Sequence, residues 1–589
     1  MSSEEERVIL TPELKARIER NKREALERLR RRKSFESFSS EANEKKLSQR
    51  ARVHGDRIRR LNGEDAKNNV AGGQYVLYWM QSSQRARYNE ALEVAVERAN
   101  AHKKPVVVAF ALTCDYEDAN ERHYNFMVKG LLDVKEGLSR RNVPFFLVTK
   151  KKKRKEEKED ASGIPEAILS LSKNAIEIVT DCGYLRVLRI WRETLARKVS
   201  ILITEVETDV VVPAFAHLSS RPKLDVSAAS FRAFALPKSF EHTENVPDLE
   251  EIVPLWNTED VEKARMSAMD ALDDRFAFVL DGRIASSSPS TPSTTAKQTA
   301  DDFLSVLKTE FGLKETPHIP KCDKYHIGGE IEAMLKLDAF IDPVVLRKYG
   351  ELRNDCSLGL QSHLAPYIHY GQISVLHVAK RARRFANVHK TDEKIQRSVE
   401  VFLDELIIRR ELGIQFVVKK RDTYDTFDAL PIWCINTLEK HKDERETRYT
   451  YEELEKGQTD DPLWNAAQNE LRISGKTHNY TRMYWGKKVV EWFRDSREAW
   501  TVLMRLNDTY SLDGRDPNSY TGVGWVFGLN DRSFPEAPIM GEVRRMSMSG
   551  CKKKFGKAID AYIDRWNGQR EKGGRQISIA NMFKKQKTR

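Results

Sequence analysis

Short apolar, β-branched runs alternate with polar, helix-forming stretches between residues 74 and 206. The runs are YVLYW (75–79), PVVVAFAL (105–112), VPFFLV (143–148), AIEIV (175–179) and SILITEV (200–206). Such alternation is typical of βαβ units, in which each helix returns the chain to the same edge of a parallel sheet. It predicts an α/β, Rossmann-like domain over 74–230, built on a parallel doubly wound sheet. No GxGxxG follows the first run, so a dinucleotide-binding interpretation of this domain has no motif support.

A different pattern begins after residue 301 and continues to about residue 570. Apolar residues recur there with helical periodicity, most strongly in 331–349, 370–388, 395–416 and 478–493. We therefore predict an all-α domain over 301–570. Residues 231–300 are expected to connect the two domains, and their Ser/Thr/Pro-rich stretch 285–298 is typical of a flexible loop.

The two ends of the chain are rich in charge. Residues 1–73 are expected to form a charged, partly disordered arm, or alternatively a basic arm that touches DNA phosphates, and 571–589 a basic tail. The N-terminus is acidic and polar, unlike a signal or transit peptide, and no window holds 18 consecutive apolar residues. We expect a soluble, intracellular, monomeric protein without a membrane span.

Charge and cysteine content narrow the class of partner. The 100 Lys and Arg exceed the 88 Asp and Glu by 12, which favours a polyanion such as nucleic acid, although a basic enzyme has the same balance. The six cysteines include no CxxC pair and no zinc spacing, so neither a disulfide framework nor a metal site is predicted. A basic run follows one predicted strand and is either a solvated loop or a nuclear localisation signal; it comprises Lys150, Lys151, Lys152, Lys153, Arg154 and Lys155.

Tryptophans gather in the last third of the chain. Seven of the ten lie between Trp433 and Trp566. Trp485 and Trp492 are two helical turns apart and share a face, and Trp464 precedes them on another helical segment. The spacing is compatible with a core stripe and with an electron relay.

Two further segments carry polar groups in unusual settings. In FLDELIIRRELG (402–413), Glu405 and Arg409 are spaced i, i+4 as a helical ion pair, while apolar neighbours make a partly buried carboxylate plausible. The segment 506–525 is dense in Asn, Asp and Gly, which is typical of a functional loop between helices.

Five motifs together resemble class II cyclobutane pyrimidine dimer photolyases. They are RNDCSLGLQSHLAPYIHYGQIS (353–374), WCINTLEKH (433–441), LWNAAQNEL (463–471), THNYTRMYWGKK (477–488) and LNDTYSLDGRDPNSYTGVGW (506–525). The resemblance spans residues 74 to 555 and implies an antenna domain followed by a helical FAD-binding domain. It implies that light-excited, reduced FAD passes an electron to a dimer flipped out of damaged double-stranded DNA, the reaction of a carbon–carbon lyase.

The resemblance also assigns roles to individual residues. Those implied to bind FAD are Tyr349, Ser362, His363, Leu364, Ala365, Arg482, Asn507, Asp513 and Gly514. Ala365 stands where many relatives have Ser, which removes one donor. Asn507 matches the residue beside flavin N5, and Glu405 matches a carboxyl that contacts the pyrimidine carbonyls and for which a raised pKa is expected.

The remaining implied roles concern the lesion and the electron. Asn479, Met483 and Trp525 are implied to line the dimer pocket with Glu405. Trp485, Trp464 and Trp492 match the photoreduction chain, with Trp485 nearest the flavin, and Tyr484 and Tyr449 are accessories. A second, antenna chromophore such as 8-hydroxy-5-deazaflavin is typical of these relatives.

A short motif in the tail suggests another partner. The segment QISIANMF resembles peptides that bind the DNA sliding clamp, through Gln576, Ile579, Met582 and Phe583. An unstructured basic tail is the alternative. For the whole chain, the alternatives to repair are a cryptochrome-like photoreceptor, which would not bind dimers in the dark, and a DNA-binding scaffold without FAD.

Overall fold

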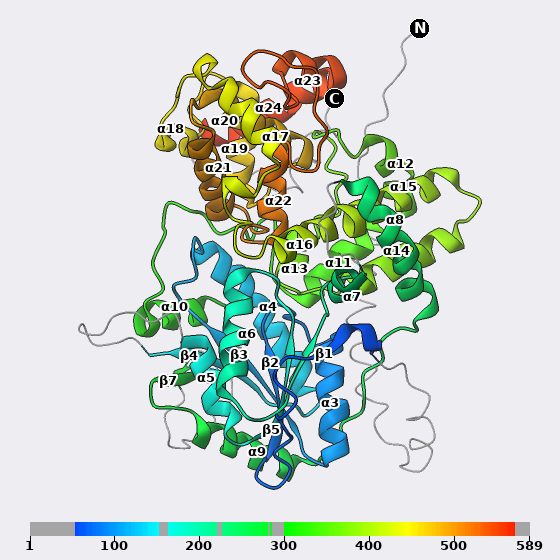
Figure 1. Cartoon of the computed structure of the whole chain (residues 1–589), viewed down its shortest axis with the longest axis vertical. Coiled ribbons are helices and arrows are strands. Elements are labelled where there is room, and N and C mark those ends of the chain that lie inside the picture. Colours follow the sequence, from blue (N-terminus) through cyan, green and yellow to red (C-terminus); the bar gives the residue numbers. More distant parts are fainter. Residues whose placement is uncertain (1–52, 152–162, 221–226, 281–282, 285–299, 572–589) are drawn as a thin grey trace, which may run out of the picture.

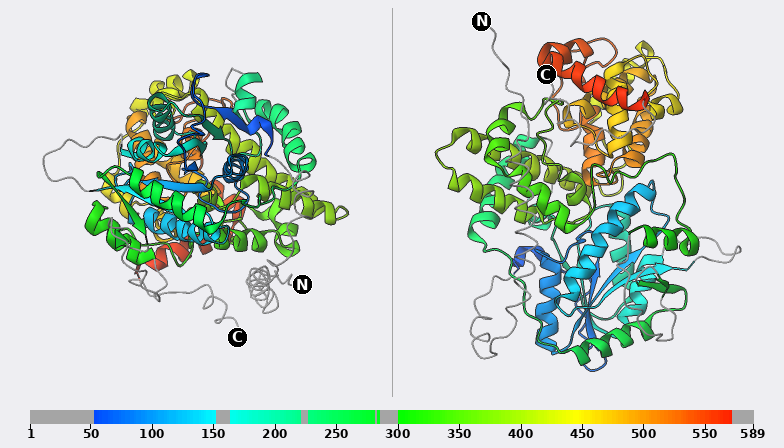
Figure 2. Two further views of the ribbon diagram at one scale, coloured as in Figure 1. Left: turned by 90° about the horizontal axis from the view of Figure 1, so that it is seen from below. Right: turned by 180° about the vertical axis from the view of Figure 1, so that it is seen from behind.

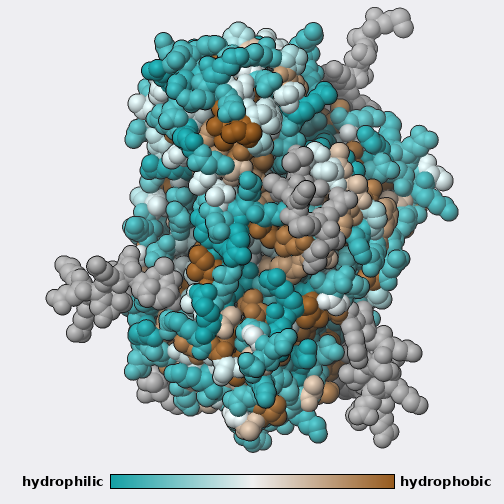
Figure 3. Space-filling model, in the orientation of Figure 1, coloured by the Kyte–Doolittle hydropathy of each residue, from teal (hydrophilic) through white to brown (hydrophobic). Residues whose placement is uncertain are grey.

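The computed structural model describes residues 53–151, 163–220, 227–280, 283–284 and 300–571. An α/β half and a helical half are stacked along the long axis of the molecule (Figure 1). The helical half is itself divided between a lobe of α17–α24 and a lobe that contains α8 and α11–α16, seen from behind in Figure 2. The face in Figure 3 is mainly hydrophilic, with several hydrophobic patches along the middle of the molecule.

The α/β half contains an eight-stranded sheet in the order β1-β6-β5-β2-β3-β4-β7-β8. Its five central strands run parallel, which confirms the predicted Rossmann-like fold. They are β2 (Tyr75–Met80), β3 (Val106–Leu112), β4 (Phe145–Lys150), β5 (Ala175–Asp181) and β6 (Ile203–Val206). Nearly every residue of these strands is buried, as expected for a parallel sheet covered on both faces.

Two sets of helices cover the sheet. One face packs against α3 (Glu90–His102), α4 (Glu121–Ser139) and α10 (Ala300–Phe311). The other packs against α5 (Gly163–Ser172), α6 (Arg186–Lys198) and α9 (Thr258–Ala271). The resulting layers place the carboxyl ends of β2, β3 and β5 next to the helical half (Figure 1).

Both edges of the sheet differ from the sequence prediction. β1 (Ile58–Arg60), within the predicted arm, pairs antiparallel with β6. β7 (Phe276–Leu280) pairs antiparallel with β4 and with β8 (Arg283–Ile284), although 231–300 was expected to be a connector. Edge strands are short and gain their stability from the neighbouring strand, so their local sequence signal is weak.

The helical half has two hydrophobic cores. One joins residues of α16 to α24 and contains Trp464, Trp485 and Trp492, and the other joins α8 with α11 to α16. The helices of the first lobe are α17 (Ile432–Lys440), α18 (Tyr451–Lys456), α19 (Pro462–Ser474), α20 (Asn479–Trp492), α21 (Ser496–Tyr510), α22 (Pro517–Val526), α23 (Met548–Phe555) and α24 (Lys557–Glu571). Those of the second are α8 (Ala228–Phe240), α11 (Glu330–Phe340), α12 (Pro343–Leu352), α13 (Ala365–His369), α14 (Val375–Val388), α15 (Glu393–Leu403) and α16 (Arg410–Lys419).

A π-helical turn interrupts the second lobe. The segment η4 (Asp404–Arg409) lies between α15 and α16 without a break in the chain. Such insertions widen the helix to i→i+5 hydrogen bonding and are frequent at functional sites. Here the turn changes which side chains of 402–413 share a face.

Candidate functional site

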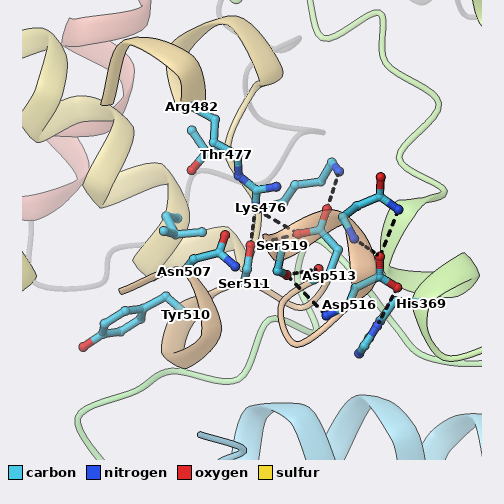
Figure 4. A network of polar contacts seen from close by, with 12 residues as sticks. His369, Lys476, Thr477, Arg482, Asn507, Tyr510, Ser511, Asp513, Asp516 and Ser519 are labelled. Carbon is cyan, nitrogen blue, oxygen red and sulfur yellow. Dashed lines mark hydrogen bonds and ion pairs between the residues drawn. The ribbon is translucent and has the colours of Figure 1, made fainter. Parts of the chain in front are cut away.

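Asp513 is the centre of a polar cluster formed by α20 and the segment after α21. Arg482 donates to its Oδ1 at 2.9 Å and Lys476 to its Oδ2 at 3.1 Å, and both are directed at it in Figure 4. The Ser511 hydroxyl donates to the same carboxylate at 2.8 Å. Burial raises the pKa of Asp513, but the charges of Arg482 and Lys476 outweigh it and hold that pKa well below its ordinary range. The cluster, one carboxylate with two cations, keeps an excess of positive charge.

The surroundings of this cluster fit an anionic, polar cofactor such as FAD. Burial, together with the charges of Lys476 and Lys336, lowers the pKa of His363 to about 3, so this ring is neutral. Arg482 Nε is buried and has no hydrogen-bond partner among the described residues, and the same holds for Nδ1 of His326, whose ring lies 6.0 Å from that of His363. These unused groups and neighbouring cations are suited to diphosphate and ring carbonyls.

The predicted phosphate-binding stretch leads into α13. His363 has a left-handed φ of 56°, which turns the chain between Ser362 and the buried Leu364. Ser362 Oγ accepts from the backbone N–H of Leu364 at 3.4 Å, and Ala365 is the first residue of the helix. The structure thus brings His363 beside the Asp513 cluster.

Asn507 lies on the last turn of α21, close to the same segment. It is buried, and its side-chain nitrogen donates to Asp508 Oδ1 at 2.8 Å. That carboxylate also accepts from the backbone N–H of Arg515 at 2.8 Å. Gly514 between them has no room for a side chain, since a Cβ there would lie 2.9 Å from the Ser511 carbonyl oxygen. The close turn therefore orients the Asn507 amide.

Glu405 pairs with a residue that sequence reasoning missed. Its Oε1 lies 2.9 Å from Nη1 of Arg353, and Arg353 also interacts with the Tyr349 hydroxyl, whose pKa burial raises to about 12. The predicted i, i+4 pair of Glu405 with Arg409 is wrong. Arg409 pairs instead with Asp404, five residues earlier, at 3.5 Å, because the π-helical turn aligns i with i+5.

Trp525 on α22 lies beside this π-helical turn. The Arg409 guanidinium is 5.1 Å from the centre of the Trp525 ring, a cation–π distance. The indole Nε1 donates to Asp531 Oδ1 at 3.0 Å, which fixes the plane of the ring. The side chain stays partly exposed, so it can be reached from solvent.

The other two residues predicted to line the dimer pocket belong to α20. Asn479 is the exposed first residue of the helix, and Met483 is partly buried one turn later. α20 and α22 touch at Gly486, where a Cβ would lie 2.5 Å from the Val526 side chain. The structure thus shows that the helix of Asn479 and Met483 packs against the helix of Trp525.

Three tryptophans form a contiguous buried row. The Trp485 and Trp464 rings stack with centroids 6.2 Å apart and an interplanar angle of 12°, and Trp464 and Trp492 are 5.5 Å apart. Tyr449 continues the row with an edge contact of 4.9 Å to Trp492 and is partly exposed. Tyr484 is not in the row and donates instead to Asp461. The row leads from α20 toward the surface.

A cavity lies between the two halves, and we call it the interdomain cavity. Residues at the carboxyl ends of the central strands line one side, and residues of α13 and the 506–525 segment line the other. Its walls include Trp79, Gln81, Leu112, Tyr124, Cys182, His369, Tyr370, Arg515 and Asp516. This position, at the switch point of a doubly wound sheet, is where ligands bind in such folds.

Some predicted residues cannot be placed. Gln576, Ile579, Met582 and Phe583 lie outside the described residues, and so do Lys152 to Lys155 of the basic run. Lys150 ends β4, and Lys151 follows it. Within the described parts of the chain, no helix is both long and apolar enough to span a bilayer.

Comparison with known sequences identifies relatives over nearly the whole chain. A family model described as DNA photolyase matches residues 76–244. The deoxyribodipyrimidine photo-lyase of Methanothermobacter thermautotrophicus is 36% identical over 517 residues, which cover 88% of this chain and 99% of that protein. The protein of the same name from Arabidopsis thaliana is 33% identical, over 83% of this chain and 88% of its own.

Solved structures agree in fold at lower identity. A class III photolyase from Agrobacterium tumefaciens superposes with a TM-score of 0.55 at 17% identity, over 85% of this chain and 88% of that one. A cryptochrome from Synechocystis reaches 0.58 at 13%, over 84% and 89%. These two structures bear on fold alone, whereas the sequence relatives span both halves and the site. The chain therefore belongs to the DNA photolyase family.

Proposed function

We propose that this chain is a class II deoxyribodipyrimidine photo-lyase, which repairs cyclobutane pyrimidine dimers in ultraviolet-damaged double-stranded DNA. When bound, reduced FAD supplies the light-driven electron that splits the cyclobutane ring. The observation that carries the proposal is that the row of indoles begins beside the Asp513 cluster. Arg482 and Trp485 lie three residues apart on α20, and the row then continues through Trp464 and Trp492.

In this proposal the Asp513 cluster holds the cofactor. Arg482 and Asp513 would hold its ring system, and Lys476 and His363 would contact its polar groups. Arg482 keeps one unused donor at Nε, which is available to a bound carbonyl or phosphate oxygen. Asn507, oriented by Asp508, presents its amide to the ring edge, where an amide can donate or accept.

Glu405 and Trp525 would hold the lesion. The Arg353–Glu405 pair would face the bound dimer, with Arg353 able to donate to a pyrimidine carbonyl and the Glu405 carboxylate able to accept from a pyrimidine N–H. Trp525, fixed by Asp531 and Arg409, offers a flat face on which a flipped base can stack, with Asn479 and Met483 alongside. A pocket of this kind selects a base that is already unpaired or damaged, since unstacking is least costly there.

The stacked tryptophans would return the flavin to its active state. The rings form a chain of neighbouring contacts from Trp485 through Trp464 to Trp492. Tyr449, which is partly exposed, contacts Trp492 at the end of this chain. An electron can therefore be drawn from an external reductant through aromatic rings to Trp485. The structural alternative, a packing role alone, predicts no loss of photoreduction when one ring is replaced.

We further propose that the interdomain cavity holds the antenna chromophore. Aromatic walls such as Trp79 and Tyr124 suit a flat conjugated ring system, for example a deazaflavin.

In the sequence, the clamp-like motif of Gln576 to Phe583 and the KKKKRK run support a nuclear protein that binds the DNA sliding clamp. A pull-down with the clamp, in which Phe583→Ala should abolish capture, tests the tail separately.

The central experiment measures repair and pigment content together. The purified protein is examined for flavin absorption, reduced chemically, and irradiated with blue light in the presence of DNA that contains cyclobutane dimers. We expect loss of dimers in the light and none in the dark. If dimers persist although fully reduced FAD is bound, the repair proposal is wrong. Dimer-specific DNA binding in the dark separates repair from a photoreceptor.

A further inference from the structure

The N-terminal turn of α4, which belongs to the α/β half, contacts the end of a helix in the other half. Asn120 Nδ2 donates to the carbonyl oxygen of Thr509 at 2.7 Å, and Arg122 Nη1 to that of Tyr510 at 2.6 Å. His123 Nε2 lies 3.1 Å from the carbonyl oxygen of Ser511. Three side chains from one turn of one half thus meet three consecutive carbonyls of the other.

The carbonyls of Thr509 and Tyr510 are among those that a helix end leaves without intrahelical partners, whereas that of Ser511, just after the helix, also accepts from the backbone N–H of Gly514 at 3.0 Å. α21 ends at Tyr510, so the last carbonyls of the helix need donors from elsewhere. Arg122 also caps the end of α19, because its guanidinium donates to the carbonyls of Leu471, at 3.3 Å, and Arg472. One buried arginine therefore holds the ends of the helices that carry Trp464 and Asn507.

Among the described residues, the Arg122 guanidinium donates hydrogen bonds to backbone carbonyls, and it also lies 5.7 Å from the centre of the Tyr510 ring. The side chain is 1% exposed, and among the described residues it forms no ion pair with a carboxylate. Burial lowers its pKa, which reflects the cost of keeping the charge there. An apolar side chain would pack two domains together without that cost, so the donors themselves are what the position requires.

The tautomer of His123 is determined by its own helix. Asn120 donates its backbone N–H to Nδ1 of His123 at 3.1 Å in the capping box of α4. The ring proton of the neutral imidazole is therefore on Nε2, which donates to the Ser511 carbonyl at 3.1 Å, and Nη1 of Arg515 lies 3.2 Å from the same nitrogen. Burial and the charges of Arg515 and Arg122 lower the pKa of His123 well below its ordinary value, so the ring stays neutral.

From Ser511 the contacts continue into the proposed cofactor site. The same residue whose carbonyl accepts from His123 donates its hydroxyl to Asp513 at 2.8 Å and also contacts Arg482. We propose that the N-terminal turn of α4 is a positioning element for the cofactor site, in which Arg122 and His123 orient the Ser511–Asp513 segment. The inference rests on the proposed FAD site, and it makes the α/β half a determinant of FAD affinity, separate from any pigment it holds.

The test compares variants of the full chain in FAD affinity. Arg122→Met should weaken FAD binding to the flavin-free protein at least about tenfold, or 1.4 kcal/mol. Arg122→Lys, which keeps the charge but reaches fewer carbonyls, should fall between. Arg140→Met is the matched control, because Arg140 lies at the other end of α4, is exposed and pairs only with Glu136 on its own helix; its affinity should equal that of the unmodified protein.

A second pair of variants tests the contact between His123 and the Ser511 carbonyl. His123→Leu should weaken FAD binding and accelerate amide hydrogen exchange of 511–516 in the flavin-free protein. His123→Gln should restore both, because its side-chain nitrogen can occupy the place of Nε2. This pair carries the test if Arg122→Met does not fold.

Each outcome separates this inference from the proposed function. Unchanged FAD affinity and unchanged exchange of 511–516 in Arg122→Met and His123→Leu would overturn the positioning role, provided that the unmodified protein binds FAD. If the unmodified protein binds no FAD, the proposed function fails, while faster exchange in the variants would still support the contact between α4 and 511–516. Loss of thermal stability without loss of affinity in the folded protein would show a purely structural contact and also overturn the inference.

Discussion

Replacement of Asp513 by Asn tests the site directly. The substitution keeps the shape of the side chain but removes the charge and one of the two acceptor oxygens. Asp513 now accepts from Arg482, Lys476 and Ser511 at 2.9, 3.1 and 2.8 Å. An amide nitrogen in place of one oxygen would face a cationic donor, so at least one of these hydrogen bonds must be lost.

The expected magnitude follows from burial and charge. The Asp513 side chain is 11% exposed, whereas those of Lys476 and Arg482 are 18% and 29% exposed. Removal of one partner from a fully buried ion pair costs about 3–5 kcal/mol. Partial exposure of the two cations allows water to solvate them, so we expect about 2–3 kcal/mol of lost stability. Because Arg482 would then be free to turn away, FAD affinity should fall by about tenfold or more.

The assay combines thermal unfolding of the flavin-free protein with a fluorescence titration of FAD. Asp425→Asn is the matched control, because Asp425 pairs with Arg186 through two contacts of 2.6 and 2.7 Å that involve neither Asp513 nor its partners. The side chains of Asp425 and Arg186 are both about one-third exposed. We therefore expect Asp425→Asn to lower the free energy of unfolding by less than about 1 kcal/mol and to leave FAD affinity unchanged. The reasoning is refuted if the two variants behave alike in both measurements.

The pH dependence of the same difference has a defined sign. The pKa of Asp513 is lower in the folded protein than in the unfolded chain, so the folded state holds the carboxylate charged. Its stabilisation is fully present above the unfolded value of about 3.9 and is lost as the pH falls through the folded pKa. The stability difference from Asp513→Asn should therefore be constant between about pH 5 and pH 8 and should shrink in acid. A difference that grows on acidification would contradict the assignment.

Three further outcomes are expected. Trp485→Phe should block photoreduction of oxidised FAD but spare repair by chemically reduced enzyme, as followed by flavin absorption and dimer loss; equal loss of both would contradict the relay. Lys487, fully buried with its pKa lowered by burial to about 7, should make the unmodified protein more stable as the pH rises from 7 to 10, by up to about 1.4 kcal/mol per unit. Lys487→Met should remove this slope in thermal unfolding, whereas an unaltered slope would show that another group titrates. Glu405→Gln should reduce the quantum yield of dimer splitting severalfold with unchanged FAD affinity; equal repair would exclude a lesion contact.

Sequence periodicity was sufficient to predict those elements whose residue pattern does not depend on a neighbouring strand. The five parallel strands are nearly continuous apolar runs, since both faces of the sheet are covered, and all five were predicted. β1 and β7 were missed, because each is short and depends on pairing with β6 or β4. The tryptophans of 464–492 were identified from their spacing. The spacing did not show whether they form a stacked electron relay or only an apolar stripe in the core.

The ion pairs between distant segments could not be predicted from the sequence. Arg353 was not expected to pair with Glu405, and Arg409 was assigned to the wrong carboxylate. The error has a single cause, a π-helical turn that shifts the register of a helix by about one residue. Ser511 lies inside a motif that was recognised and Lys476 lies just before another, yet their role in holding Asp513 depends on the contact between two loops.

The sequence by itself determined which elements form and which family their motifs resemble, because these depend on local periodicity and on residue types in a conserved order along one chain. The tertiary structure decided which groups meet. Only the packing of the two halves directs Asn120, Arg122 and His123 at the consecutive carbonyls of 509–511. Hydrogen bonds act over about 3 Å, whereas these partners are separated by almost 390 residues of sequence, so no local pattern can record them.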